Sequence, residues 1–103
     1  MIAQSVSYSE PETSPEIDAS AIPSGTRLAQ LGAYESAEIA RSEWMNMQER
    51  FGGILRGKSR VVQEAQSGGR TFYRLRAMGF VELSDARRFC SALSAEGAEC
   101  IPV

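Results

Sequence analysis

The sequence predicts an α+β domain, and three observations lead to this prediction. Segments with strand-like alternation and segments with helical periodicity follow one another in the order β-α-β-β-α-β. Glycine-rich turns and candidate N-caps separate these segments. Residues 1–25 are acidic, hold three of the four prolines and contain no Lys or Arg. We therefore expect one small domain in residues 26–103, preceded by a disordered linker in residues 1–25.

The first half of the domain begins with a strand and a helix. Residues 27–33 have the composition of a strand, and Ser36 is a candidate N-cap for the helix that follows. Apolar residues at helical spacing form one stripe on that helix: Ala40, Trp44, Met47 and Phe51. Gly52-Gly53 is expected to end the helix.

A hairpin and a second helix follow. Ser67-Gly68-Gly69 is expected to form the turn between strands at 58–65 and 70–78. Ser84 is a candidate cap for the second helix, which Gly97 is expected to stop before a last strand in residues 98–103. The apolar stripe of the second helix consists of Ala86, Phe89, Cys90 and Leu93.

This order of elements is that of the split βαβ, ferredoxin-like plan. It predicts a four-stranded antiparallel sheet with both helices on one face. No remaining segment is left to cover the other face, so that face is the expected place for a ligand.

Strand alternation predicts which side chains lie on the open face. In the strand at 70–78, Tyr73, Leu75 and Ala77 are expected to face the helices. In the strand at 27–33, the core positions are expected to be Ala29, Leu31 and Ala33. The open face is then expected to carry Leu28, Gln30, Gly32, Phe72, Arg74, Arg76 and Met78.

Charge and composition limit the classes of function. All eleven Lys and Arg lie from Arg27 onward against nine acidic residues there, so the domain is mildly basic although the chain has a net charge of −2. No apolar stretch is long enough to span a bilayer, and we expect no membrane contact by this segment. With no histidine and two cysteines, neither a metal site nor a cofactor is expected.

Two short motifs resemble the sporulation-related repeat (SPOR) domain family. Gln30-Leu31-Gly32-Ala33-Tyr34 is similar to the Gln-Leu-Gly-small-aromatic pattern of its first strand, and residues 73–80, YRLRAMGF, resemble the pattern before its second helix. The resemblance covers residues 27–103. Met78-Gly79 departs from the family's Gly-Pro, and Ala29 stands where a β-branched residue is common.

The resemblance implies a non-catalytic, monomeric module that binds peptidoglycan. It implies a preference for glycan strands stripped of stem peptides, and a place at the division septum in the periplasm. Carried over by position, the implied glycan contacts are Gln30, Arg74, Arg76, Phe72 and Leu28. The contribution of the second strand stays open between Arg60 and Gln63, because the sequence does not fix its register.

Three other classes of function are alternatives to glycan binding. The chain has no arrangement of residues typical of an enzyme. RNA-recognition domains share the βαββαβ plan, but Gly69-Arg70-Thr71-Phe72-Tyr73 does not match their stacking pattern, and a pI of about 5.1 disfavours nucleic acid. A protein-interaction module of the same fold is the third alternative.

Cys90 and Cys100 allow two states. They lie on neighbouring predicted elements, so a disulfide between them would stabilise a small domain by roughly 2–4 kcal/mol. Two buried free cysteines are the other possibility.

Overall fold

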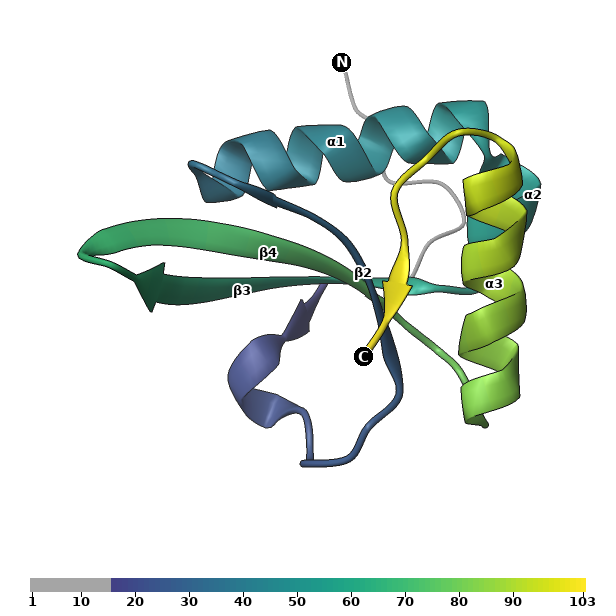
Figure 1. The fold of residues 1–103 in the computed structure, drawn as a ribbon, viewed down its shortest axis with the longest axis horizontal. Helices are drawn as coiled ribbons and strands as arrows, with labels where there is room; N and C mark the ends of the chain where they lie inside the picture. Colours follow the sequence, from purple (N-terminus) through teal and green to yellow (C-terminus); the bar gives the residue numbers. More distant parts are fainter. Residues whose placement is uncertain (1–15) are drawn as a thin grey trace, which may run out of the picture.

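The computed structural model describes residues 16–103 and shows one sheet with its longest helix along one side and a short 3-10 helix on the other side (Figure 1). The elements in chain order are β1 Ile17–Asp18, the 3-10 turn η2 Ala19–Ala21, β2 Leu28–Tyr34, α1 Ala37–Arg50, α2 Gly52–Leu55, β3 Ser59–Ser67, β4 Arg70–Met78, α3 Leu83–Ala95 and β5 Ile101–Pro102. The α+β class predicted from the sequence is confirmed.

The sheet has five strands in the order β1-β3-β4-β2-β5. Strands β3, β4, β2 and β5 pair antiparallel, in an order consistent with the split βαβ plan. Strand β1 instead pairs parallel with β3, with Ile17 opposite Val61. The structure therefore differs from the predicted four-stranded antiparallel sheet, because a segment assigned to the linker adds a fifth strand.

Part of the segment that was expected to be a linker forms secondary structure. Residues 1–15 of the expected linker lie outside the described residues, but residues 17–21 form β1 and η2. These elements are two and three residues long, which is too short for either periodicity to be visible in the sequence.

The helix ends follow local capping chemistry, with two corrections. The Ser36 side chain accepts a hydrogen bond from the Ile39 backbone N–H at 3.1 Å, as expected of an N-cap. Helix α1 ends at Arg50 with Phe51 as its C-cap, and Gly52-Gly53 begins the short helix α2 instead of capping α1. The N-cap of α3 is Glu82 and not Ser84, and the Asp85 carboxylate accepts from the Glu82 backbone N–H at 3.2 Å.

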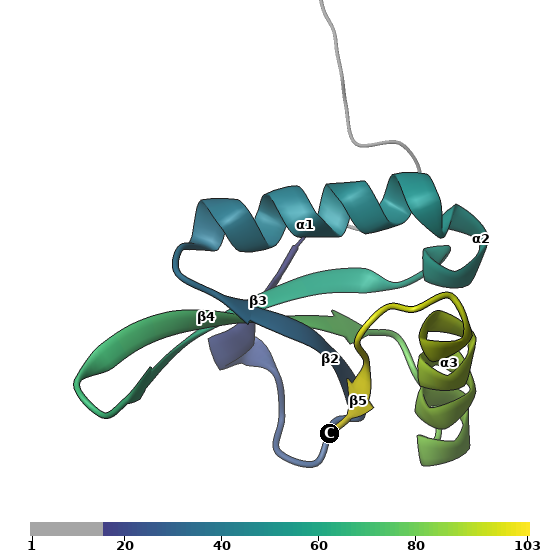
Figure 2. The ribbon, with the colours of Figure 1, turned by 45° about the horizontal axis from the view of Figure 1, so that its top comes forward.

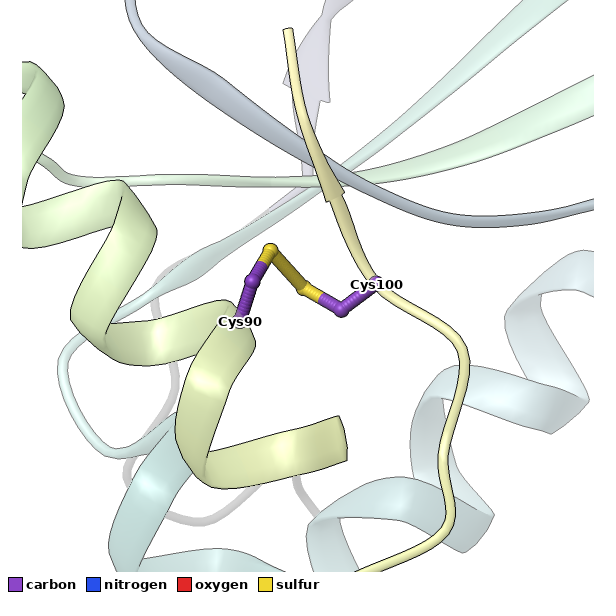
Figure 3. Close-up of a disulfide and its surroundings, with 2 residues drawn as sticks. All are labelled: Cys90 and Cys100. Atoms are coloured by element: carbon purple, nitrogen blue, oxygen red, sulfur yellow. A yellow bond between two sulfur atoms is a disulfide. The ribbon is translucent and has the colours of Figure 1, made fainter. Parts of the chain in front are cut away.

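The apolar core lies between the sheet and the helices (Figure 2). Both predicted stripes are buried, and Trp44, Leu75 and Leu93 are each at most 2% exposed. A disulfide joins Cys90 in α3 to Cys100, directly before β5 (Figure 3). Of the two states that the sequence allowed, the cysteines are in the bonded one.

Candidate functional site

The pairing of β3 with β4 defines the side chains on the sheet face that α1 and α3 leave uncovered. We call this the helix-free face. Directly opposite residues share a face, and Arg76 is opposite Val61, Arg74 is opposite Gln63, and Phe72 is opposite Ala65. Phe72, Arg74 and Arg76 therefore lie on the helix-free face, as predicted, and Gln63 joins them.

A β-bulge in β2 changes the predicted assignment of its last residues. Gln30 is opposite Arg76, but the next residue in register is Gly32, opposite the buried Leu75, so Leu31 is the extra residue. After the bulge, Gly32 lies on the core side and Ala33 lies opposite Arg74 on the helix-free face. The prediction that Ala33 faces the core and Gly32 faces out is wrong, because uninterrupted alternation does not hold across a bulge.

Arg76 lies in the middle of the helix-free face and is held by two amides. Its Nε and Nη2 donate to Gln30 Oε1 at 3.0 and 2.9 Å, and its Nη1 donates to Gln63 Oε1 at 2.8 Å. A guanidinium has five N–H donors, so one N–H on Nη1 and one on Nη2 remain for a ligand. The sheet thus orients the side chain and leaves part of its donor set unused.

The charge of Arg76 has no carboxylate partner among the described residues. Burial, and then the charge of Arg74, lowers the pKa of the Arg76 guanidinium, although an arginine keeps its proton at neutral pH. The acidic residues of the described strands, Asp18 and Glu64, have the register of the opposite face. A half-buried cation among neutral acceptors is suited to an anionic ligand.

Arg74 and Phe72 form the next part of the site toward the β3–β4 hairpin. The Arg74 guanidinium carbon lies 5.3 Å from the centroid of the Phe72 ring, a cation–π distance. Both side chains are half-buried. Together they offer an apolar plane and a second positive charge beside Arg76.

Two other residues considered as glycan contacts differ from the rest: Leu28 is nearly buried, and Arg60 lies on the opposite face of the sheet. Leu28 has the register of the helix-free face but is only 8% exposed. Arg60 is opposite Ala77, on the side of the helices, where its Nε donates to Glu16 Oε1 at 2.8 Å. Of Arg60 and Gln63, Gln63 is therefore the one that has the register of the helix-free face.

Sequence reasoning also missed Ile101. It lies opposite Gln30 on the last strand and is 50% exposed, so it adds apolar surface next to the amide. The register of a two-residue edge strand cannot be derived from its own sequence, so no local signal marked Ile101 as a residue of this face.

A pocket of about 350 Å³ lies on the helix-free face beside Arg76. Gln63 and Arg76 contribute from the sheet, and residues between Ala19 and Thr26 contribute from the other side. Residues 16–103 contain no cluster of His, Cys, Asp or Glu suited to a metal ion. Within the same residues, no helix has the length and apolar character needed to cross a membrane.

Comparison with known proteins gives one family and one relative. The family model described as SPOR domain matches residues 23–103. A protein named Cell division protein FtsN, from Caulobacter vibrioides (strain NA1000 / CB15N), is 32% identical over 71 residues. That match covers 69% of this chain and 27% of the relative, so the two share only a part of the longer protein. No solved structure matches the chain significantly. The family model covers most of the chain, and the chain belongs to the SPOR domain family.

Proposed function

We propose that this domain binds bacterial peptidoglycan without catalysis, through its helix-free face, and that it prefers glycan strands stripped of stem peptides. Membership of the SPOR family and the likeness to a cell division protein support binding at the septal cell wall. The observation that carries the finer proposal is the half-buried Arg76, oriented by Gln30 and Gln63 and without a carboxylate partner in the described chain.

The chemistry of denuded glycan matches this cation. Removing the stem peptide leaves a free lactyl carboxylate on every second sugar, and a guanidinium meets a carboxylate with two hydrogen bonds. The unused N–H groups on Nη1 and Nη2 of Arg76 are the donors for those bonds. An intact peptide would replace the charge by a neutral amide and add bulk.

The surroundings of Arg76 fit the rest of a sugar. Phe72 lies on β4 beyond Arg74, and Ile101 lies next to Gln30 on the far side of β2; both present apolar surface against which the apolar face of a sugar ring can pack. Arg74 adds a second charge that attracts an anionic strand. Phe72 is the one aromatic residue on the helix-free face within the described strands, which is a poor stacking platform for RNA.

A sacculus pull-down tests the proposal. Purified sacculi are compared before and after digestion with an amidase that removes stem peptides, and binding is expected to rise after digestion. Arg76→Ala is expected to weaken binding to digested sacculi by about 10–100-fold, the value of a lost charge-assisted pair. Arg76→Lys keeps the positive charge but lacks the paired N–H donors of a guanidinium, and is expected to retain only part of the affinity.

Two results would contradict the proposal. If the wild-type domain does not bind digested sacculi, denuded glycan is not its ligand. If Arg76→Ala and Arg76→Lys both bind digested sacculi as tightly as wild type does, the proposed pairing of Arg76 with a carboxylate is wrong. Arg87→Ala, at an exposed position on α3, is the matched control and is expected to bind as wild type.

A further inference from the structure

Residues 16–27, which we call the strap, pass across the helix-free face on the side of the sheet opposite α1 (Figure 1). Most of the strap precedes Pro23, where the family match begins. It is nevertheless attached at both ends. Ile17 pairs with Val61 at the β3 edge, and at the other end the Leu28 backbone exchanges hydrogen bonds with Val103.

Glu16 fixes the first end of the strap through two arginines from different elements. Its Oε1 and Oε2 accept from Nε and Nη2 of Arg41, in α1, at 2.9 and 3.1 Å. The same Oε1 accepts from Arg60 Nε, in β3, at 2.8 Å. One carboxylate therefore ties the strap to a helix and to a strand.

The strap covers one end of the helix-free face and leaves the other end open. Val61 and Leu28 have the register of this face, yet they are 1% and 8% exposed. The apolar end of the face is thus sealed. Arg76 and Gln63 lie at the boundary, where the sealed part meets solvent.

The pocket beside Arg76 is the space between the strap and the sheet. Ile22, Ser24 and Thr26 line it from the strap, and its volume of about 350 Å³ is within the range of small-ligand sites. Thr26 is held in its own turn, because its hydroxyl and its N–H both donate to Pro23 O, at 2.8 and 3.3 Å. This wall of the pocket is therefore built by the chain itself.

We propose that the strap is one wall of the ligand site, that the carboxylate-bearing sugar ring of a denuded strand enters the pocket between the strap and Arg76, and that Glu16 is the positioning residue that holds this wall. The inference rests on the proposed glycan binding. A wall that excludes water beside a guanidinium strengthens the attraction between that guanidinium and a carboxylate. It also gives a single sugar ring two surfaces to contact, where a bare sheet gives one.

Two substitutions in the 103-residue chain test the wall from opposite directions. Ser24→Trp is expected to fill the pocket with an indole while Glu16 still holds the strap, and to weaken binding to amidase-digested sacculi by about tenfold or more. Glu16→Gln is expected to release the strap, seen as faster hydrogen exchange in residues 17–22, and to weaken binding several-fold. Ser42→Trp and Glu49→Gln, both at exposed positions on α1, are the matched controls.

The outcomes separate this inference from the proposed function. If wild type binds digested sacculi, Arg76→Ala does not, and Ser24→Trp and Glu16→Gln bind as wild type, glycan binding stands and the wall is refuted. Tighter binding by either strap variant also overturns the inference, because the strap would then obstruct the site. If wild type does not bind, the proposed function fails first. Loss of binding in both strap variants, with near-UV circular dichroism like that of wild type and unaffected controls, supports the wall.

Discussion

Gln30 and Gln63 give Arg76 two acceptors without giving it a counter-charge. A carboxylate in either place would neutralise the guanidinium, whereas an amide orients it and leaves its charge for a ligand. The amides also offset part of the cost of removing the cation from water. In the proposed site, the two uncharged residues are therefore expected to matter for an anionic ligand together with the arginine.

Gln30→Glu tests this role by changing one atom group. The new carboxylate is expected to form an ion pair with Arg76, so that binding to digested sacculi falls by about tenfold or more while the thermal midpoint stays at or above the wild-type value. Gln66→Glu is the matched control, since Gln66 lies on β3 with the register of the opposite face. An equal loss of binding in Gln30→Glu and Gln66→Glu would mean that the added negative charge, and not an ion pair with Arg76, weakens binding.

Glu16 predicts a pH dependence of stability. The hydrogen bond from Arg41, with the charges of Arg41 and Arg60, lowers the pKa of Glu16 below its ordinary value of 4.5 against the opposing effect of burial. Between the folded-state pKa and the unfolded-state value of about 4.5, the unfolded chain binds more protons than the folded chain. The stabilisation from Glu16 is therefore complete above about pH 4.5 and is lost as the pH falls through the folded-state pKa. Denaturant unfolding at pH 7 is expected to show Glu16→Gln less stable than wild type.

The difference in free energy of unfolding between wild type and Glu16→Gln is expected to become smaller as the pH is lowered below about 4.5. Glu49→Gln, measured over the same range, accounts for the effect of removing one negative charge from the surface. A gap between wild type and Glu16→Gln that stays constant down to pH 2 would contradict the ion-pair assignment.

At the scale of the element, the bulge in β2 decides what each side of that strand carries. Past Leu31, Gly32 faces the core beneath Tyr34, and a Cβ built on Gly32 would lie 2.5 Å from the Tyr34 hydroxyl oxygen and 2.8 Å from Cζ. Tyr34 is partly buried against the core cluster, so moving its ring away would disturb that packing. The glycine is required here by close approach and not by its backbone dihedral.

Gly32→Ala is therefore expected to destabilise the domain by about 1–3 kcal/mol, the usual cost of overpacking. Chemical denaturation measures it. Gly53→Ala is the control, because a Cβ there meets nothing within 4 Å and the position is helical, so a small gain of about 0.4–1 kcal/mol is expected. Equal stability of Gly32→Ala and wild type would show that Tyr34 can move aside.

The same element shows how far the sequence could predict the site. Alternation placed Arg74, Arg76 and Phe72 correctly, because β4 is regular over its whole length. It failed at Ala33, since alternation does not continue across a bulge, and the glycine inside the strand, Gly32, was the available sign of one. Gln63 and Ile101 depended on the registers of neighbouring strands, which are set by tertiary pairing.

At the scale of the whole molecule, the fold was predictable where elements are long and periodic. The stripes on α1 and α3 were predicted correctly because many residues carry each signal. Strand β1 and η2 were not, because β1 is a two-residue strand held by pairing with β3 and by the ion pairs of Glu16, and η2 is only three residues long with a local cap at Asp18. A small domain depends on such attachments because its core is limited.

The disulfide is another such attachment, and its removal is expected to weaken the molecule as a whole. Reduction of Cys90–Cys100 frees β5 from α3 and is expected to cost about 2–4 kcal/mol. Thermal unfolding with and without reductant measures the loss. The double variant Cys90→Ala, Cys100→Ala is expected to show no response to reductant, and a response there would mean that the reductant acts elsewhere.

The strap has a consequence for how this domain is delimited. The shared family segment begins at Pro23, whereas the folded unit already includes Glu16 and β1. A change in residues 16–22 can thus reshape one side of the pocket while every residue matched to the family stays the same. A fragment trimmed to the family boundary would carry Arg76, Gln30 and Gln63, but it would lack Ala19 and Ile22, which line one side of the pocket beside Arg76.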